Sequence, residues 1–372
     1  MLKRYQCQCG NPVFFPNSVC LVCNTPLGYD TGLGLLIPLK PGEQPGQWLA
    51  YQAAATPAES EEAALPRYIR CANLETPAAC NWLIAVSQPG SDIFCRACCL
   101  NRTIPDLADP DHPQNGMYWG RVELAKRRML AGLLGLNLAI TSKQDDPAGG
   151  LAFDLISSQQ GASPVLTGHD SGLITLNLQE ADDATRESIR SAMGEPYRTL
   201  LGHFRHETGH YFWDRLVNNS GWLDGFRQLF GDESQDYAAA LQNHYAAGPP
   251  KDWWLNYVSS YSASHPWEDW AETWAHYLHM CDTVDTATSF GLDMNAQLLD
   301  FTPFTLDALY DPNDKTAAEF LTFLNEWMAL TVLLNEMSRS MGQADFYPFV
   351  LPGPVVAKLQ FVHLVIRGAS HT

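Results

Sequence analysis

The chain has 372 residues, of which 46% are hydrophobic and 17% charged, with 11 Trp, 14 Tyr and 16 Phe. This composition excludes a disordered or fibrous protein, and the length predicts two or three domains. Of the net charge of −18, nearly all lies after residue 150: Lys and Arg number 12 against 13 Asp and Glu in residues 1–150, and 11 against 28 in residues 151–372. A nucleic-acid partner is not expected, because binding the phosphate backbone requires a basic surface.

We expect a cytoplasmic protein that does not associate with membranes. The sequence reaches Cys7 before an apolar segment of signal-peptide length can begin. The longest apolar runs, residues 129–140 and 320–334, are shorter than a bilayer span or are interrupted by polar residues.

Nine of the ten cysteines lie within residues 7–99. Cys7-x-Cys9 and Cys20-x-x-Cys23 form two close pairs beside turn-forming Gly and Pro residues, a spacing typical of a zinc ribbon. A second set with one tight pair predicts a second Cys₄ zinc site, made by Cys71, Cys80, Cys95 and Cys98. The alternatives are a disulfide framework or buried thiols, and a reducing compartment disfavours disulfides. Cys99 is left over, and Cys281 is interpreted as a core thiol.

Proline and glycine residues divide the chain. Residues 41–66 are interpreted as a loop or extended excursion between the two cysteine sets, and residues 105–116 mark the end of the cysteine-rich part. We therefore predict a double zinc-ribbon region over residues 1–105 and a second domain over residues 106–372.

The second domain is predicted to be mainly helical with a small β-sheet, which gives an α+β protein. A helix is expected over residues 118–136, followed by strands over 152–156 and 172–177. Beyond Asp182 the pattern is mainly helical, with a closing helix near residues 316–341.

The segment His206-Glu207-Thr208-Gly209-His210 carries the clearest chemical signal. At ~3.6 residues per turn a helix brings both histidines onto one face, where two imidazoles can bind one zinc ion, and Glu207 lies beside the metal as a general base. His203, one turn earlier, is interpreted as a surface residue or as support for a ligand. Large apolar residues surround the motif, which predicts a buried helix.

A catalytic zinc site needs a third protein ligand and one open position. Residues 211–220 contain no histidine, and His244 lacks the required spacing. Pro266 can begin a helix that presents Glu268 and Glu272 one turn apart on one face, among several aromatic residues. A carboxylate on a second helix is the gluzincin arrangement, but the spacing alone does not choose between the two glutamates.

The chain resembles the bacterial zinc-binding metallopeptidases that carry an N-terminal double zinc ribbon. The resemblance extends from Cys7 through His206–His210 and Trp267–Glu272 to Tyr347–Phe349. It implies a double zinc ribbon followed by a zincin-like, gluzincin domain, but no particular substrate. A polypeptide substrate is expected from the chemistry of the zinc ligands and Glu207.

The Glu-x-x-Ala-Glu pattern that begins at Glu268 is also similar to that of the catalytic domain of anthrax lethal factor. These resemblances imply that Glu268 ligates zinc, that Glu272 accepts a hydrogen bond from a ligating imidazole, and that the phenol of Tyr261 assists catalysis. From the residues alone, either Tyr261 or His265 could donate a hydrogen bond to the oxyanion. The strand over residues 172–177 could bind an extended peptide by edge pairing.

The sequence thus predicts a zinc peptidase with about three zinc ions, two in Cys₄ sites and one held by His206, His210 and Glu268. The ribbons are expected to bind a protein partner or to position the substrate. The main alternative is a non-catalytic adaptor with a structural or sensing zinc site, which has no need of Glu207. A ribbon-based transcription factor is disfavoured by the charge.

Overall fold

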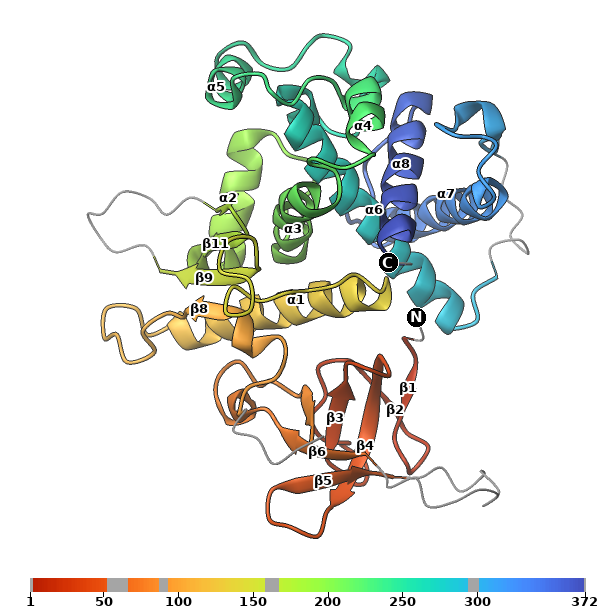
Figure 1. Cartoon of the computed structure of the whole chain (residues 1–372). Helices are drawn as coiled ribbons and strands as arrows, with labels where there is room; N and C mark the ends of the chain where they lie inside the picture. The colour runs from red at the N-terminus through yellow and green to blue at the C-terminus, as the bar shows by residue number, and fades with distance from the viewer. Residues whose placement is uncertain (1–2, 52–65, 87–92, 158–166, 294–300, 371–372) are drawn as a thin grey trace. The chain divides into compact units, whose positions relative to one another are not determined.

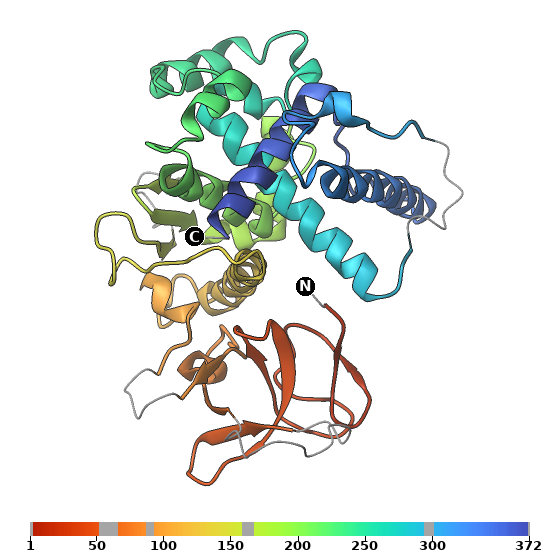
Figure 2. The same ribbon diagram turned by 45° about the vertical axis from the view of Figure 1, so that its right-hand side comes forward.

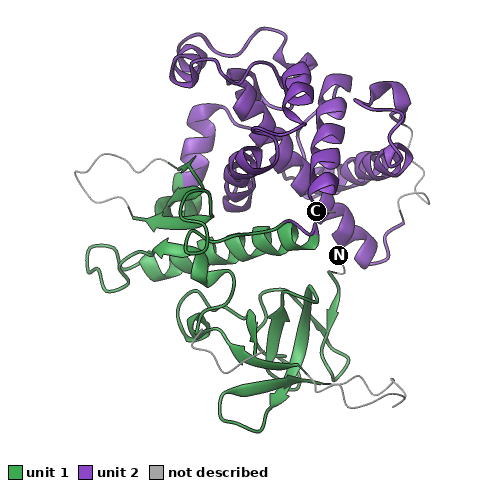
Figure 3. Ribbon diagram, viewed as in Figure 1, with its two compact units in different colours: residues 1–135, 139–185 green, residues 136–138, 186–372 purple. Residues whose placement is uncertain are grey.

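A computed structural model describes residues 3–51, 66–86, 93–157, 167–293 and 301–370. Two compact units make up the chain (Figure 3): residues 1–135 with 139–185, and residues 136–138 with 186–372. The first unit contains the β-sheets and one long helix, and the second is helical. The α+β fold expected from the sequence is confirmed.

The cysteine-rich part of the first unit is built from short antiparallel strands. A hairpin joins β1 (Tyr5–Gln6) to β2 (Pro12–Val13). A five-stranded sheet in chain order comprises β3 (Leu27–Asp30), β4 (Leu35–Pro41), β5 (Gln47–Ala50), β6 (Arg67–Arg70) and β7 (Leu83–Ala85). Tyr29 and Trp82 pack with ring centroids 5.4 Å apart at the centre of this part.

Residues 41–66 were expected to be a loop or an extended excursion. Strand β5 corrects this expectation, because part of the segment belongs to the sheet. It pairs with β4 and β6, and Trp48 packs against a small core of Leu39, Tyr68 and Leu83. Burial of this aromatic side chain favours a strand in a segment whose Pro and Gly content indicates a loop. Residues 52–65 of the excursion lie outside the described residues.

The rest of the first unit combines a helix with a mixed sheet. The helix α1 (Asn115–Gly135) agrees with the prediction over residues 118–136. The sheet has the order β10-β11-β9-β8, formed by β8 (Asn101–Thr103), β9 (Ala152–Ile156), β10 (Gly168–Asp170) and β11 (Leu173–Asn177).

Strand β11 is an inner strand, so the prediction that residues 172–177 bind a peptide by edge pairing is wrong. It pairs in parallel with β9 on one edge and antiparallel with β10 on the other. The short β10 forms a hairpin with β11 through a turn at Ser171–Gly172, and this partner cannot be inferred from the alternation within β11 itself.

The second unit is helical, as predicted for residues beyond Asp182 (Figure 1). Its helices are α2 (Asp183–Met193, whose first three residues belong to the first unit), α3 (Leu200–Leu216), α4 (Leu223–Phe230), α5 (Tyr237–Ala247), α6 (Pro266–Ser289), α7 (Ala317–Ser340) and α8 (Gly353–Ala369). A 3₁₀ turn, η5 (Tyr261–Ser264), precedes α6. The predicted closing helix is α7, but α8 follows it and was not predicted.

Helix α6 is the centre of this unit. It packs most extensively against α3 and also contacts α8, α7 and α4; Figure 2 shows α8 crossing it. Trp270 and Trp274 of α6 are fully buried. A buried ion pair, 2.7 Å between Lys358 Nζ and Asp269 Oδ2, joins α8 to α6 next to Glu268.

Among the described residues, only α7 is long and apolar enough to cross a membrane by length and composition. Its Phe320, Leu324 and Trp327 side chains are buried within the unit, whereas Val332 and Met337 are exposed.

Candidate metal centre

Helix α3 carries the two histidines. Thr199 caps its N-terminus, where Oγ1 accepts a hydrogen bond from Gly202 N at 3.0 Å. Four residues apart on one face, His206 and His210 have ring centroids separated by 4.9 Å. Phe204 is fully buried on the helix and Phe212 stacks on Trp274 of α6. The rigid, packed helix therefore fixes both imidazoles.

Helix α6 brings the carboxylates. Pro266 is its first residue and His265 is its N-cap, with Nδ1 accepting a hydrogen bond from Trp267 N at 3.1 Å. The two helices approach closely because α3 has a glycine at the crossing: a Cβ on Gly209 would lie 2.9 Å from Ala271 Cα. This approach places Glu268 opposite the histidines.

Three potential ligand groups converge between the helices. The ligand atoms of His206, His210 and Glu268 all lie within 4.8 Å of one another. Glu268 Oε2 is 3.0 Å from His206 Nε2, and Oε1 is 3.5 Å from His210 Nε2. Two nitrogen or oxygen ligands of one tetrahedral zinc ion lie roughly 3.3 Å apart, so the donor set and its spacing fit zinc.

The outer nitrogen of His206 has its own partner. His206 Nδ1 lies 2.8 Å from Glu272 Oε1, and Glu272 Oε2 accepts a hydrogen bond from Ser259 Oγ at 2.7 Å. In the neutral, metal-binding form of the ring, a proton held on Nδ1 by this carboxylate leaves the lone pair on Nε2, which is the atom that faces Glu268. Although burial opposes it, contact with Glu268 and Glu272 raises the pKa of His206 well above its usual range.

Glu207 lies on α3 between the two histidines. Its side chain is buried, at 8% exposure, and this burial raises the pKa of the carboxyl group. It is not one of the three converging groups, so its oxygens do not complete the ligand set.

Two tyrosines adjoin the centre. Tyr261, on η5, has its ring centroid 6.0 Å from that of His206. Tyr237, at the start of α5, donates a hydrogen bond to Glu268 Oε1 at 2.6 Å. Burial, followed by the charge of Glu268, raises the pKa of both phenols, so both are hydrogen-bond donors at neutral pH.

Other candidates from the sequence lie elsewhere. His265 is buried with both ring nitrogens near backbone groups, Nε2 being 3.2 Å from Gln235 O. His203 is half-buried on α3, and neither it nor His244 belongs to the converging group. Cys281 is half-buried on α6.

Sequence reasoning missed Tyr237 and Ser259. Each contacts a carboxylate of α6 from a distant position, and neither lies in a motif. The only local signal was Asp236, the N-cap that begins α5 at Tyr237.

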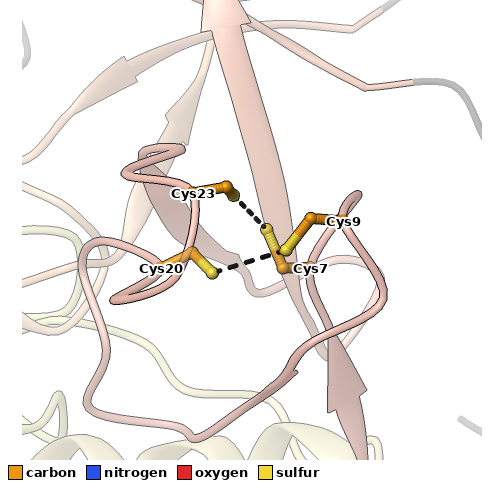
Figure 4. A group of neighbouring side chains, drawn as sticks. All are labelled: Cys7, Cys9, Cys20 and Cys23. Carbon is orange, nitrogen blue, oxygen red and sulfur yellow. Dashed lines mark hydrogen bonds between the residues drawn. The ribbon is translucent and has the colours of Figure 1, made fainter.

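The cysteines form the two predicted clusters. In the first, Cys7 Sγ lies 3.6 Å from Cys23 Sγ and Cys9 Sγ lies 3.8 Å from Cys20 Sγ (Figure 4). In the second, which is wholly buried, Cys80 and Cys95 Sγ are 3.5 Å apart, and Cys71 and Cys98 complete the group. Thiolates on one zinc ion lie roughly 3.8 Å apart, so both sets fit zinc. Cys99 is exposed and outside both clusters.

Comparisons with known proteins also separate a cysteine-rich N-terminal part from the part that holds the His/His/Glu group. Residues 115–365 match the model of a family described as "putative zinc-binding metallo-peptidase", and residues 4–109 match that of a zinc-ribbon domain. An uncharacterized protein of Mycobacterium bovis and two of Mycobacterium tuberculosis are each 41% identical over 367 residues, which cover 98% of this chain and 95% of theirs. No solved structure matches the chain.

Proposed function

We infer the function from the family to which the chain belongs, the putative zinc-binding metallopeptidases, and propose that it hydrolyses peptide bonds at the centre between α3 and α6. The observation that carries the proposal is the convergence of His206, His210 and Glu268 with a further buried carboxylate, Glu207, beside them. A purely structural zinc site has four closed ligands and no use for this extra carboxylate.

His206 Nε2, His210 Nε2 and Glu268 would hold the zinc ion. When bound, zinc lowers the pKa of its water toward ~7 and polarises the carbonyl of the peptide. Three protein ligands leave a fourth position open, which is the arrangement of catalytic rather than structural zinc sites.

Glu207 is the proposed general base. Its buried carboxylate would take the proton from the attacking water and deliver it to the leaving amine. Burial within the packed α3 helix holds the group in place, so little reorganisation is needed during the reaction.

Tyr261 is the proposed donor to the oxyanion. Its ring lies beside His206, and its raised pKa keeps the hydroxyl protonated. His265 is less suited to this role, because its ring caps α6 and its other nitrogen faces a backbone carbonyl. We therefore favour the phenol over the imidazole.

The ribbons are proposed to bind a protein partner or to position the polypeptide substrate, and we place the protein in the cytoplasm, where thiols stay reduced. The exposed Leu21 and Val22, between the cysteines of one pair, offer apolar side chains for such contacts.

The experiment that tests the proposal compares the wild-type protein with Glu207→Gln on a proteome-derived peptide library, with zinc content measured for both. We expect cleavage by the wild type and none by the variant at equal zinc content, because the amide preserves shape but cannot accept the proton. Identical cleavage patterns would reject the peptidase, as would zinc-loaded wild type that cleaves nothing; the latter would favour the adaptor alternative.

A further inference from the structure

Tyr237 connects an exposed helix to the metal centre. Its hydroxyl donates to Glu268 Oε1 at 2.6 Å across 31 residues of sequence. Among the residues of α5, none is buried, so this bond is a specific attachment rather than a by-product of core packing.

The two oxygens of Glu268 have different surroundings. Oε1 accepts the bond from Tyr237, whereas Oε2 is buried and has no bond from a hydroxyl group among the described residues. Oε2 is also the oxygen that lies 3.0 Å from His206 Nε2. With zinc bound, Glu272 would keep the remaining proton of His206 on Nδ1, so that Nε2 and Glu268 Oε2 could both be directed at the ion. Oε2 therefore lies on the side of Glu268 that faces His206, and Oε1 is held by the phenol.

We propose that Tyr237 is a positioning residue that turns Glu268 so that Oε1 is bound to the phenol and Oε2 is presented to zinc. The proposal rests on the metal site described above and not on peptide hydrolysis. In this arrangement two of the zinc ligands each have a hydrogen-bond partner that does not itself bind zinc. Glu272 orients His206, and Tyr237 orients Glu268.

The local structure holds the phenol in place. Asp236 caps α5, its Oδ1 accepting from Ala239 N at 3.0 Å, which fixes the helix at Tyr237. The tyrosine ring packs edge-on against His265 at 5.2 Å and against Trp267 at 5.7 Å between centroids. Since its single hydroxyl proton is used by Glu268, Tyr237 is assigned the positioning role and not that of donor to the oxyanion.

The test is Tyr237→Phe, which keeps the packed ring and removes only the hydroxyl. We expect the zinc affinity of the His/His/Glu site to fall by ~10–100-fold in a competitive chelator titration, with both ribbon zinc ions retained as an internal measure of folding. The matched control is Tyr118→Phe, which removes another phenol-to-carboxylate bond, 3.1 Å from Tyr118 to Asp182 Oδ1, within the first unit. Affinity unchanged in Tyr237→Phe, or lowered equally in Tyr118→Phe, would overturn the proposal.

A second measurement separates positioning from direct catalysis. If wild-type protein cleaves peptides, the activity of Tyr237→Phe should be low at limiting zinc and return to at least half of wild type at saturating zinc. A loss that saturating zinc does not restore would overturn the positioning role. The chelator titration needs no substrate, so it decides the proposal even if the peptidase assignment fails.

Discussion

The metal centre depends on the position of one proton. Glu272, itself fixed by Ser259, lies 2.8 Å from His206 Nδ1 and thereby selects the tautomer that offers Nε2 to a metal. Sequence spacing puts Glu268 and Glu272 on one helical face and leaves their roles open. The contacts separate them, because Glu272 faces the outer nitrogen of His206 and Glu268 faces the inner nitrogens of both histidines.

We predict different zinc affinities for Glu268→Ala and Glu272→Ala. Loss of Glu268 should empty the site, since two histidines alone leave zinc under-coordinated. Loss of Glu272 should weaken affinity by only ~10–100-fold, because the ligands remain and only the orientation of His206 is lost. A competitive chelator titration measures the zinc affinity of each variant, with the zinc ions of the intact ribbons as an internal reference. Retention of zinc in Glu268→Ala together with its loss in Glu272→Ala would reverse the assignment.

We also predict that Tyr261→Phe lowers turnover on the order of 10²-fold with little change in zinc content, because removing one oxyanion donor affects the transition state and not the ligands. Steady-state kinetics with metal analysis checks this. Tyr237→Phe supplies the contrast, because that variant should have a lower zinc affinity but near-normal turnover once zinc is saturating. Turnover equal to wild type would leave Tyr261 with a packing role only.

At the scale of elements, the site depends on the crossing of α3 and α6. Gly209 allows the backbones to meet, and Trp270 Nε1 donates to Gly209 O at 2.8 Å across the crossing. The glycine within the His-Glu-Thr-Gly-His motif is therefore a packing requirement as well as a spacer between ligands.

We predict that Gly209→Ala destabilises the protein and weakens the His/His/Glu zinc site. Helix propensity alone would favour alanine by about 1 kcal/mol. The added Cβ would meet the backbone of Ala271 at 2.9 Å, however, and overpacking of this kind costs ~1–3 kcal/mol. Because α6 must move away, Glu268 and Glu272 should separate from His206. Denaturant unfolding and zinc titration are the measurements.

The control is Gly132→Ala, in the long helix α1, where a Cβ would have no atom within 4 Å. This variant should be stabilised by about 0.5–1 kcal/mol and should keep its zinc affinity. A Gly209→Ala protein that behaves like this control would show that the crossing tolerates a methyl group.

The elements that the sequence predicted are those with strong local signals. Pro266 and the histidine spacing mark α6 and α3, and the cysteine pairs mark the clusters. Features set by distant partners were missed: β10 beside β11, the pairing of β5, and the bond from Tyr237. Periodicity reports which face of a segment is apolar, but it does not report which segment will cover that face.

The three candidate metal sites differ in accessibility. All four cysteines of the second cluster are buried, whereas the first has Cys9 exposed and Cys23 half-exposed. The His/His/Glu site has three ligands, with His206 half-buried. The domain limits of 1–105 and 106–372 remain a prediction, since the compact units divide near residue 185 and the family models divide between residues 109 and 115.

We predict about three zinc ions per chain, removed by a chelator in a fixed order. The His/His/Glu ion should leave first, because an open position lets a chelator bind before the protein ligands dissociate. The first cysteine cluster should follow through its exposed Cys9, and the buried second cluster should release zinc last, when its part of the chain unfolds. Elemental analysis and time-resolved chelation with a colorimetric indicator measure the number and the order. Should carefully prepared protein contain no more than one zinc ion, the cysteine clusters would not be zinc ribbons, and buried thiols would be the simpler interpretation.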